Sequence, residues 1–347
     1  MRQIPFSDIQ SAAASIYDVA VRTPLVRLPL PDEVSRHIGG SEIFLKLETL
    51  QPVGSFKIRG AWNAIRQLTR EELRDGVWTV SAGNAAQGVA LAARHAGTSC
   101  SVMVMDTAPQ AKLDAIERLG ASIVPVTYDE CWATAQSHAS SRMRGRFVHP
   151  FDDDQFIAGN ATIALESLED VPDVDAIVAS VGGGGLISGV ASAIRALKPD
   201  VTIVAAEPET GAPLSVSLAK GAASGFDGWQ PTFVDGAGAK SVLETMWPLL
   251  SRLVDESIVV PLDEVSAAMR LIAQRCHVIA EGAAACAVAA SLRLADARSP
   301  LDVARGDPEA LEGSGQALRE RGGGRIVAVV SGGNIDLAKF ASLVGAC

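Results

Sequence analysis

The chain has 347 residues, of which 48% are hydrophobic and 20% are charged, and its formal net charge is −10. This composition supplies a sizeable core for one large domain or two moderate ones, and it excludes an intrinsically disordered chain. The 40 acidic residues outnumber the 30 basic ones, and no basic stripe is present. Nucleic acid is therefore excluded as the main partner.

The cysteines and the N-terminal residues indicate where the protein works. The five cysteines are scattered and none forms a CxxC pair, which is typical of a reducing compartment rather than a disulfide framework. The opening MRQIPFSDIQ has no apolar run, and GAAACAVAASLRLA at 282–295 is too short to cross a bilayer. We expect a cytoplasmic protein with no membrane partner, and a buried core helix at 282–295.

Residues 77–149 alternate short β-branched runs with segments of helical periodicity. The pattern predicts strands at 77–80, 101–105, 122–126 and 147–149, separated by helices at 84–97, 109–120 and 129–143. Gly97 and Gly120 stand where helices would end, and Pro109 stands where one would begin. Such an alternation indicates a parallel sheet covered by helices.

The alternation resumes in the second half of the chain. The predicted elements are helix 155–169, strand 176–181, helix 186–197, strand 202–207, helices 263–276 and 282–295, strand 325–330 and a last helix. The acidic run at 152–154 is typical of a helix start rather than a metal site. Residues 208–255 look less regular, and the low-complexity stretch 296–324 is expected to be a surface insertion.

Three glycine-containing turns follow predicted strands: SAGN at 81–84, GGGG at 182–185 and SGGN at 331–334. Ligands of open α/β sheets bind beyond the carboxyl ends of the strands, so three such turns suggest one shared site. The tetraglycine turn would offer bare N–H groups and the positive end of a helix dipole to a phosphate. A tight turn without a ligand is the alternative there, and simple helix capping is the alternative at the other two turns.

Lys57 follows Gly54, Ser55 and Phe56 at the predicted start of a helix. The helix dipole disfavours a positive charge at that place, and burial would lower the pKa of the amine as well. A neutral amine can form a Schiff base or act as a general base. Most lysines are solvated surface residues, but the apolar Phe56 and Ile58 beside Lys57 give little sign of a charged surface.

A phosphate cradle, a neutral hydroxyl, a carboxylate loop and a lysine of lowered pKa are the parts of a pyridoxal 5'-phosphate enzyme. The motifs that carry a family resemblance are, in order, GSFKIRGA, SAGNAAQGVA, FIAGNATIALE, GGGGLISGV, AAEP and VSGGNIDL. With them the chain, from about Thr23 to Leu337, resembles the fold-type II pyridoxal phosphate enzymes. The closest resemblance is to the serine/threonine dehydratases (ammonia-lyases) and serine racemases.

The resemblance implies an α/β fold similar to the tryptophan synthase β subunit. Each of two domains would hold a mostly parallel twisted sheet flanked by helices. The small substrate-closing domain would be 76–152, inserted into a large cofactor-binding domain formed by 1–75 and 153–347. The cofactor would lie between the two domains.

The resemblance also implies roles for individual residues. Lys57 would hold the cofactor as a Schiff base and move the Cα proton of the substrate. The other cofactor-binding residues would be Phe56, Asn84, Gly182, Gly183, Gly184, Gly185, Leu186, Glu281 and Ser331, with the glycine turn at the phosphate and Ser331 at the pyridine nitrogen. The substrate carboxylate would be surrounded by Ser81, Asn84, Ala85 and Gln87.

A neutral Ser331 has a consequence for the reaction. A hydroxyl, unlike a carboxylate, does not stabilise a protonated pyridine ring, so a full carbanion is disfavoured and loss of a β-substituent is favoured. The implied reaction converts a β-hydroxy amino acid of the L-threonine or L-serine class, through an aminoacrylate, to a 2-oxo acid and ammonia. No amino-acid-sensing domain is recognisable in the sequence, so we expect a catabolic role, and we expect the homodimer that is usual in the family.

Three departures from the family pattern leave alternatives open. The racemases carry a second serine where this chain has Ala82, which makes a racemase the weaker alternative. Ala85 replaces the usual histidine, and the room it leaves suggests 3-hydroxyaspartate or phenylserine as substrate. The racemase branch binds a cation through a glutamate and an aspartate. Glu207 is present here but Pro213 replaces the aspartate, so Mg²⁺ or another cation would have Glu207 and the Gly211 carbonyl as ligands.

Overall fold

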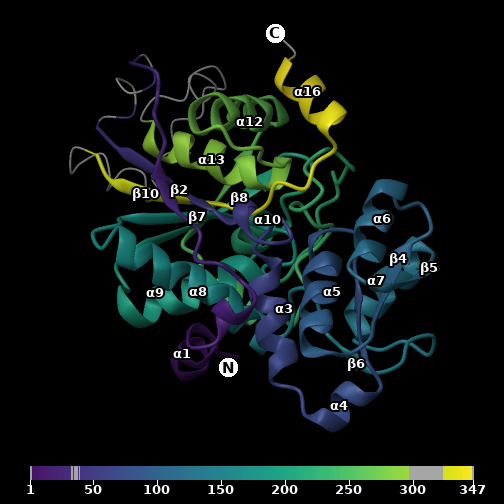
Figure 1. Ribbon diagram of the computed structural model, residues 1–347. Helices are drawn as coiled ribbons and strands as arrows, with labels where there is room; N and C mark the ends of the chain where they lie inside the picture. The colour runs from purple at the N-terminus through teal and green to yellow at the C-terminus, as the bar shows by residue number, and fades with distance from the viewer. Residues whose placement is uncertain (1, 33, 35–37, 39, 297–322, 346–347) are drawn as a thin grey trace.

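The structure is a computed structural model that describes residues 2–32, 34, 38, 40–296 and 323–345. Two β-sheets organise this part of the chain, one of six strands and one of four, and helices surround both (Figure 1). All strand pairs but one are parallel. The predicted α/β class with mostly parallel sheets is confirmed. No helix of the described residues is both long and apolar enough to span a membrane.

The four-stranded sheet is built from the alternating segment. Its strand order is β5-β4-β3-β6, and the strands are β3 Val77–Val80, β4 Cys100–Met105, β5 Ser122–Val126 and β6 Arg146–Phe147. The connecting helices are α5 Asn84–Ala96, α6 Gln110–Arg118 and α7 Tyr128–Ser137. The predicted order of strands and helices is confirmed, and Gly97 ends α5 in the left-handed conformation with φ 70°.

One helix of this segment is shorter than the pattern predicts. The prediction ran to residue 143, but α7 ends at Ser137. His138 follows with φ 58°, a left-handed conformation that an α-helix does not continue. Helical periodicity alone does not reveal such a stop.

The six-stranded sheet has the order β1-β2-β10-β7-β8-β9, and only the β1-β2 pair is antiparallel. Its strands are β1 Leu25–Arg27, β2 Glu42–Leu47, β7 Ala176–Ser180, β8 Thr202–Pro208, β9 Glu256–Val260 and β10 Arg325–Val330. Strands β7, β8 and β10 were predicted, whereas β1, β2 and β9 were not. The last three mix charged with apolar residues, and most side chains of β1 and β9 are only partly buried.

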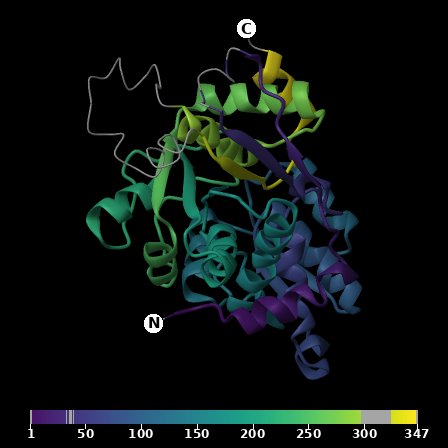
Figure 2. The same ribbon diagram turned by 90° about the vertical axis from the view of Figure 1, so that its left-hand side faces the viewer.

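Helices cover both faces of the six-stranded sheet (Figures 1 and 2). One face packs on α12 Leu262–Cys276 and α13 Gly282–Ala295, and the other packs on α1 Phe6–Ala13, α8 Asp154–Asp170, α9 Gly185–Leu197 and α11 Trp247–Leu253. Alternate side chains of β7 enter the two cores, Val178 on the first face and Ile177 on the second. A strand buried on both faces reads as a continuous apolar run, which is why β7 was easy to predict.

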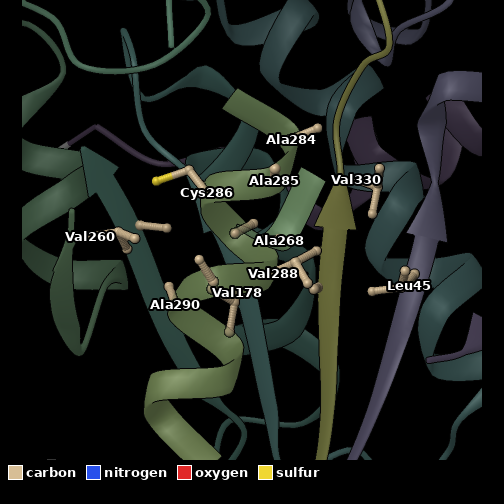
Figure 3. Close-up of a cluster of buried hydrophobic side chains, with 14 of the residues drawn as sticks. Leu45, Val178, Val260, Ala268, Ala284, Ala285, Cys286, Val288, Ala290 and Val330 are labelled. Carbon is tan, nitrogen blue, oxygen red and sulfur yellow. The ribbon is translucent and has the colours of Figure 1, made fainter. Parts of the chain in front are cut away.

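The predicted core helix at 282–295 is confirmed as α13. Its mostly small side chains lie against residues of β2, β7, β9 and β10 (Figure 3). The cluster includes Leu45, Val178, Val260, Val330 and, from the helix, Ala284, Ala285, Cys286, Val288 and Ala290. Small side chains allow a helix to approach a sheet closely.

Helix α3, Lys57–Arg66, lies between α8 and α5 and so between the two sheets (Figure 1). Glycines make its contact with α8 unusually close. A Cβ at Gly60 would lie 2.2 Å from the ring of Phe156, and one at Gly159 would lie 2.4 Å from the carbonyl oxygen of Arg59. The helix that begins at Lys57 therefore packs so closely on α8 that no side chain fits at these two glycines.

The remaining elements are short. They are η1 Ile16–Asp18, η2 Glu48–Leu50, α4 Arg70–Arg74, α10 Pro213–Lys220 and α16 Leu337–Gly345. Helices α10 and α11 fall within 208–255, where the sequence pattern was irregular. The acidic run at 152–154 does start a helix, since the carboxylate of Asp153 accepts the N–H of Phe156 at 2.9 Å.

Two sequence-based expectations about the organisation of the chain stay predictions. One is the division into domains at 1–75 with 153–347 and at 76–152. The other is the surface insertion at 296–324, of which 297–322 lie outside the described residues.

Candidate active site

The three predicted glycine turns line one cavity of about 410 Å³. The turns follow β3, β7 and β10, as the rule for carboxyl ends of strands requires. The predicted site residues that line the cavity are Phe56, Lys57, Ser81, Asn84, Ala85, Gln87, Gly182, Gly183, Glu281 and Ser331. Those that do not line it are Gly184, Gly185 and Leu186, which continue the turn into α9, and Glu207 and Gly211.

Backbone hydrogen bonds bring distant segments together at this cavity. The N–H of Phe56 donates to the carbonyl oxygen of Ser331 at 3.0 Å, and the N–H of Glu281 donates to that of Gly332 at 3.0 Å. The turn after β10 therefore holds both the loop before Lys57 and the residue that precedes α13.

Lys57 is the first residue of α3, and its side chain lines the cavity. Its Nζ donates to the carbonyl oxygen of Pro150 at 2.6 Å and lies 5.1 Å and 5.4 Å from the ring centres of Phe56 and Phe156. Burial lowers the pKa of Lys57 to about 8, although the negative charge of Glu281 opposes this shift. An amine with this pKa is partly neutral near pH 7, as a nucleophile or base requires.

Glu281 is buried on the same cavity, and amide side chains hold it. Its Oε1 accepts from Nδ2 of Asn84 at 2.7 Å, and Oδ1 of Asn84 accepts from Nδ2 of Asn334 at 2.8 Å. Burial raises the pKa of Glu281 to about 7; the charge of Asp235 adds to this shift and the hydrogen bond from Asn84 opposes it. The cavity thus holds one acid and one base that both exchange protons near neutral pH.

The glycine turn between β7 and α9 has room for backbone but not for side chains. Gly184 is the N-cap of α9 with φ 90°, a conformation that favours glycine. A Cβ at Gly183 would lie 2.2 Å from the ring of Phe151, and one at Gly185 would lie 2.6 Å from the Phe151 carbonyl oxygen. The first N–H groups of a helix have no partner within it, so this turn offers donors and a partial positive charge to an anion.

The loop between β3 and α5 makes a second place for an anion. The N-cap of α5 is Gly83, and no side chain caps this helix. The Ser81 hydroxyl instead accepts from the N–H of Gly83 at 3.1 Å. Ser81, Asn84 and Gln87 line the cavity beside the uncapped helix start, which suits a carboxylate.

Glu207 has a structural role in α10. Its carboxylate accepts from the N–H groups of Leu214 and Ser215 at 2.9 and 2.8 Å and from the hydroxyl of Ser257 at 2.7 Å. Burial raises the pKa of this carboxyl group. These three donors already use most of the acceptor positions of the carboxylate, so this geometry gives the predicted cation no support.

Several cavity residues were missed by the sequence analysis. Pro150 and Phe151 follow β6, so the rule for strand ends could have pointed to them. Asn334 is the last residue of the SGGN motif, and its role as a donor to Asn84 could not be read from the motif alone. Lys112 and Asp235 also line the cavity, and no local pattern marks either.

A buried charge network of Lys46, Glu48, Arg59 and Glu166 supports α3. Arg59 donates to Glu48 at 2.7 and 2.8 Å and to Glu166 at 2.6 and 3.0 Å. Lys46 donates to Glu166 at 2.5 Å and to the carbonyl oxygen of Thr23 at 2.6 Å. These bonds join the helix that carries Lys57 to β2, η2 and α8.

Together these groups fit pyridoxal phosphate. The donors at the start of α9 suit its phosphate, and a Cβ would fill the space that the glycines leave. The amine of Lys57 suits its aldehyde, and the neutral Ser331 hydroxyl on the same cavity suits an unprotonated ring nitrogen.

Comparison with known proteins agrees with this fit. The family model of the pyridoxal-phosphate dependent enzymes matches residues 16–303. The chain is 37% identical to the L-threonine ammonia-lyase of Thermotoga maritima over 336 residues, which cover 96% of this chain and 76% of that one. Among solved structures, the processed threonine deaminase isoform 2 of Solanum lycopersicum has a TM-score of 0.81 and 31% identity, covering 98% of this chain and 91% of its own. Serine racemase from Dictyostelium discoideum has a TM-score of 0.78 and 32% identity, and the match covers 96% of this chain and 99% of that one. The chain belongs to the family of pyridoxal-phosphate dependent enzymes.

Proposed function

We propose that this protein is an ammonia-lyase that converts a β-hydroxy amino acid of the L-threonine or L-serine class to a 2-oxo acid and ammonia. The observation that carries the proposal is the Lys57 amine, with its pKa lowered to about 8, on the same cavity as Ser331 and the glycine turn. The relatives named as threonine ammonia-lyase and threonine deaminase support this choice of substrate.

The cofactor-holding residues are proposed from their chemistry. Lys57 would bond to the aldehyde carbon of the cofactor, and the N–H groups of 182–186 would bind its phosphate. Phe56 and Glu281 would lie beside its ring, and Asn84 would bind its phenolic oxygen. Pyridoxal phosphate, when bound, withdraws electrons from the Cα atom of the attached amino acid and so makes the Cα–H bond acidic.

The protein side chains would then orient the substrate and move protons. The start of α5 would bind the substrate carboxylate, with Ser81, Asn84, Ala85 and Gln87 around it. Once the amino group of the substrate has taken its place at the cofactor, the free Nζ of Lys57 would take the proton from Cα, which its lowered pKa allows near neutral pH. The β-hydroxyl would take up one proton, equal to the one lost from Cα, and leave as water. A later hydrolysis would consume one water and release ammonia. Threonine would thus give 2-oxobutanoate and ammonia in balance.

A racemase is the weaker candidate, although serine racemase is among the similar structures. Racemisation with two bases needs a proton acceptor on the face of the substrate opposite Lys57. The methyl group of Ala82 lines the cavity at the position where that acceptor is expected, and a methyl group accepts no proton.

The first experiment tests Lys57. Purified wild type supplied with pyridoxal phosphate should absorb near ~410–420 nm, and Lys57→Ala should lose both this band and all detectable turnover. Lys220→Ala, at an exposed lysine of α10, is the matched control and should keep both. A wild type that stays colourless contradicts the proposal.

The second experiment tests the substrate class. L-serine, L-threonine, threo- and erythro-3-hydroxyaspartate and phenylserine are assayed for release of ammonia and oxo acid, with and without Mg²⁺. We expect turnover of L-threonine or L-serine. Inactivity on all five refutes the lyase, and a strict need for Mg²⁺ would support the predicted cation.

Assembly and location stay expectations. We expect a homodimer because the family resemblance implies one, so light scattering should give twice the 36.1 kDa of one chain. A mass near that of one chain would contradict it. The cytoplasmic location is an expectation that rests on the cysteine pattern.

A further inference from the structure

The cavity holds a second pair of ionisable side chains. Among its described lining residues, the ionisable ones are Lys57, Lys112, Asp235 and Glu281. Nζ of Lys112 forms an ion pair with Oδ2 of Asp235. The two side chains are 35% and 54% exposed, so this pair lies at the mouth of the cavity, unlike the buried Glu281.

The ion pair lies beside the expected place of the substrate. Lys112 belongs to α6, which follows β4, and β4 pairs with the strand that leads into the carboxylate loop. Asp235 precedes Gly236, at which a Cβ would lie 3.6 Å from Oε1 of Glu281. Both charges also act on Glu281. The pair therefore lies between the carboxylate loop and the side of the cavity that holds Glu281.

Apart from the carboxylate loop and the other polar groups described above, much of the cavity lining is apolar. This apolar part includes Ala82, Ala85, Met105, Ala237 and Ala239. A substrate side chain that extends toward the mouth would meet methyl and thioether groups and one ion pair that is already neutralised.

We propose that Asp235 makes this cavity select β-hydroxy amino acids with an uncharged side chain and reject those with a second carboxylate. The proposal rests on the proposed function. Lys112 alone would attract a second carboxylate. With Asp235 bonded to it, that carboxylate has to displace Asp235 and meets its negative charge. The side chains of threonine, serine and phenylserine leave the ion pair intact, so 3-hydroxyaspartate is disfavoured although Ala85 leaves it room.

The turnover experiment compares kcat/KM for threo-3-hydroxyaspartate with kcat/KM for L-threonine. In Asp235→Asn, where Lys112 is released, this ratio should rise at least about tenfold. The double variant Lys112→Met with Asp235→Asn should lose most of that rise. Asp227→Asn removes a charge from an exposed position of the same segment that does not line the cavity, and it should change the ratio less than about twofold.

A binding experiment separates failure of this inference from failure of the proposed function. Succinate and butyrate have the same four-carbon chain, and only succinate has a second carboxylate. By calorimetry on the cofactor-loaded protein, Asp235→Asn should bind succinate at least about tenfold more tightly and butyrate unchanged. Asp235→Ala repeats the test in case the new amide still holds Lys112.

Two results overturn the inference. One is a wild type that prefers the hydroxyaspartate to threonine. The other is an unchanged succinate affinity in both Asp235 variants. If no β-hydroxy amino acid is turned over, the lyase proposal fails, while the succinate comparison still decides whether Asp235 excludes a second carboxylate.

Discussion

Lys57 and Arg59 lie two residues apart on α3, but their cationic groups face different surroundings. Arg59 faces the buried charge network, where it donates to the carboxylates of Glu48 and Glu166. Lys57 faces the cavity, where it donates to the uncharged carbonyl group of Pro150.

The two surroundings change the pKa in opposite directions. Burial alone would lower the pKa of Arg59, but Glu48 and Glu166 raise it above its ordinary value. For Lys57 burial dominates, and the pKa falls from 10.5 to about 8. Burial with hydrogen-bonded counter-charges therefore fixes a charge, while burial without them creates a group that exchanges its proton near neutral pH.

The largest expected effect comes from breaking the charge network. Glu166→Gln keeps the shape of the side chain but leaves Lys46 and Arg59 short of a counter-charge. The free energy of unfolding should fall by about 3–5 kcal/mol in chemical denaturation. Glu169→Gln, on the same helix but in a surface ion pair with Arg22, should cost less than about 1 kcal/mol. Equal losses would contradict the contrast between the two regions.

Removing Lys57, the lysine on the cavity, should raise the free energy of unfolding instead of lowering it. In cofactor-free protein, Lys57→Met should raise the free energy of unfolding at pH 7 by about 1–3 kcal/mol, because no amine is left to desolvate. The cost of burying charged Lys57 is present below its folded pKa of about 8 and disappears as pH rises toward its unfolded value. The gain should therefore shrink between pH 8 and 10. A destabilised variant at pH 7 would show that Lys57 is paired like Arg59.

Glu281 gives a smaller effect that depends on pH. Its pKa is about 7 in the folded chain against an ordinary 4.5, so between these values the folded state binds more protons than the unfolded one. Its contribution to stability is complete below pH 4.5 and is lost as pH rises through 7. Cofactor-free Glu281→Gln should lack this loss, and its stability relative to wild type should rise by about 1–2 kcal/mol from pH 5 to 8. If the stability of both proteins changed with pH in the same way, the raised pKa of Glu281 would be contradicted.

The smallest expected effect lies at the edge of the charge network. The hydroxyl of Tyr17 donates to Oε1 of Glu166 at 2.7 Å, and this side chain is partly exposed. Tyr17→Phe should lower the free energy of unfolding by about 1 kcal/mol. Tyr128→Phe is the control, because the contact of Tyr128 with Lys240 is made through its ring, which phenylalanine keeps. If Tyr17→Phe lowered the free energy of unfolding as much as Glu166→Gln, the network would depend on the Tyr17 hydroxyl as much as on its charged groups.

The parts of the site that could be predicted have local signals. Strands β7 and β10 are apolar runs because both of their faces are buried, and the glycines that follow β7 mark a turn without side chains. The rule for carboxyl ends of strands then placed three distant turns on one cavity. Lys57 could be singled out because of its place at a helix start.

What could not be predicted depends on partners far along the chain. Strand β2, EIFLKL, contains Lys46 as its fifth residue. This lysine is buried because Glu166, 120 residues away, supplies its counter-charge. The ion pair of Lys112 and Asp235 joins residues 123 positions apart. Periodicity and composition carry no information on such pairings, so β2 and the mouth of the cavity became visible only in the folded chain.

The close packing of α3 on α8 limits the positions at which the substrate specificity of this enzyme can be changed. Neither Gly60 nor Gly159 leaves space for one methyl group, so the helix cannot be re-aimed to suit a different substrate. New specificity has to come from side chains that line the cavity, such as Ala85 and Asp235. A directed-evolution library would do best to spare the helix and randomise those two positions, because the residue proposed to move the proton and the residues proposed to choose the substrate lie on different segments of the chain.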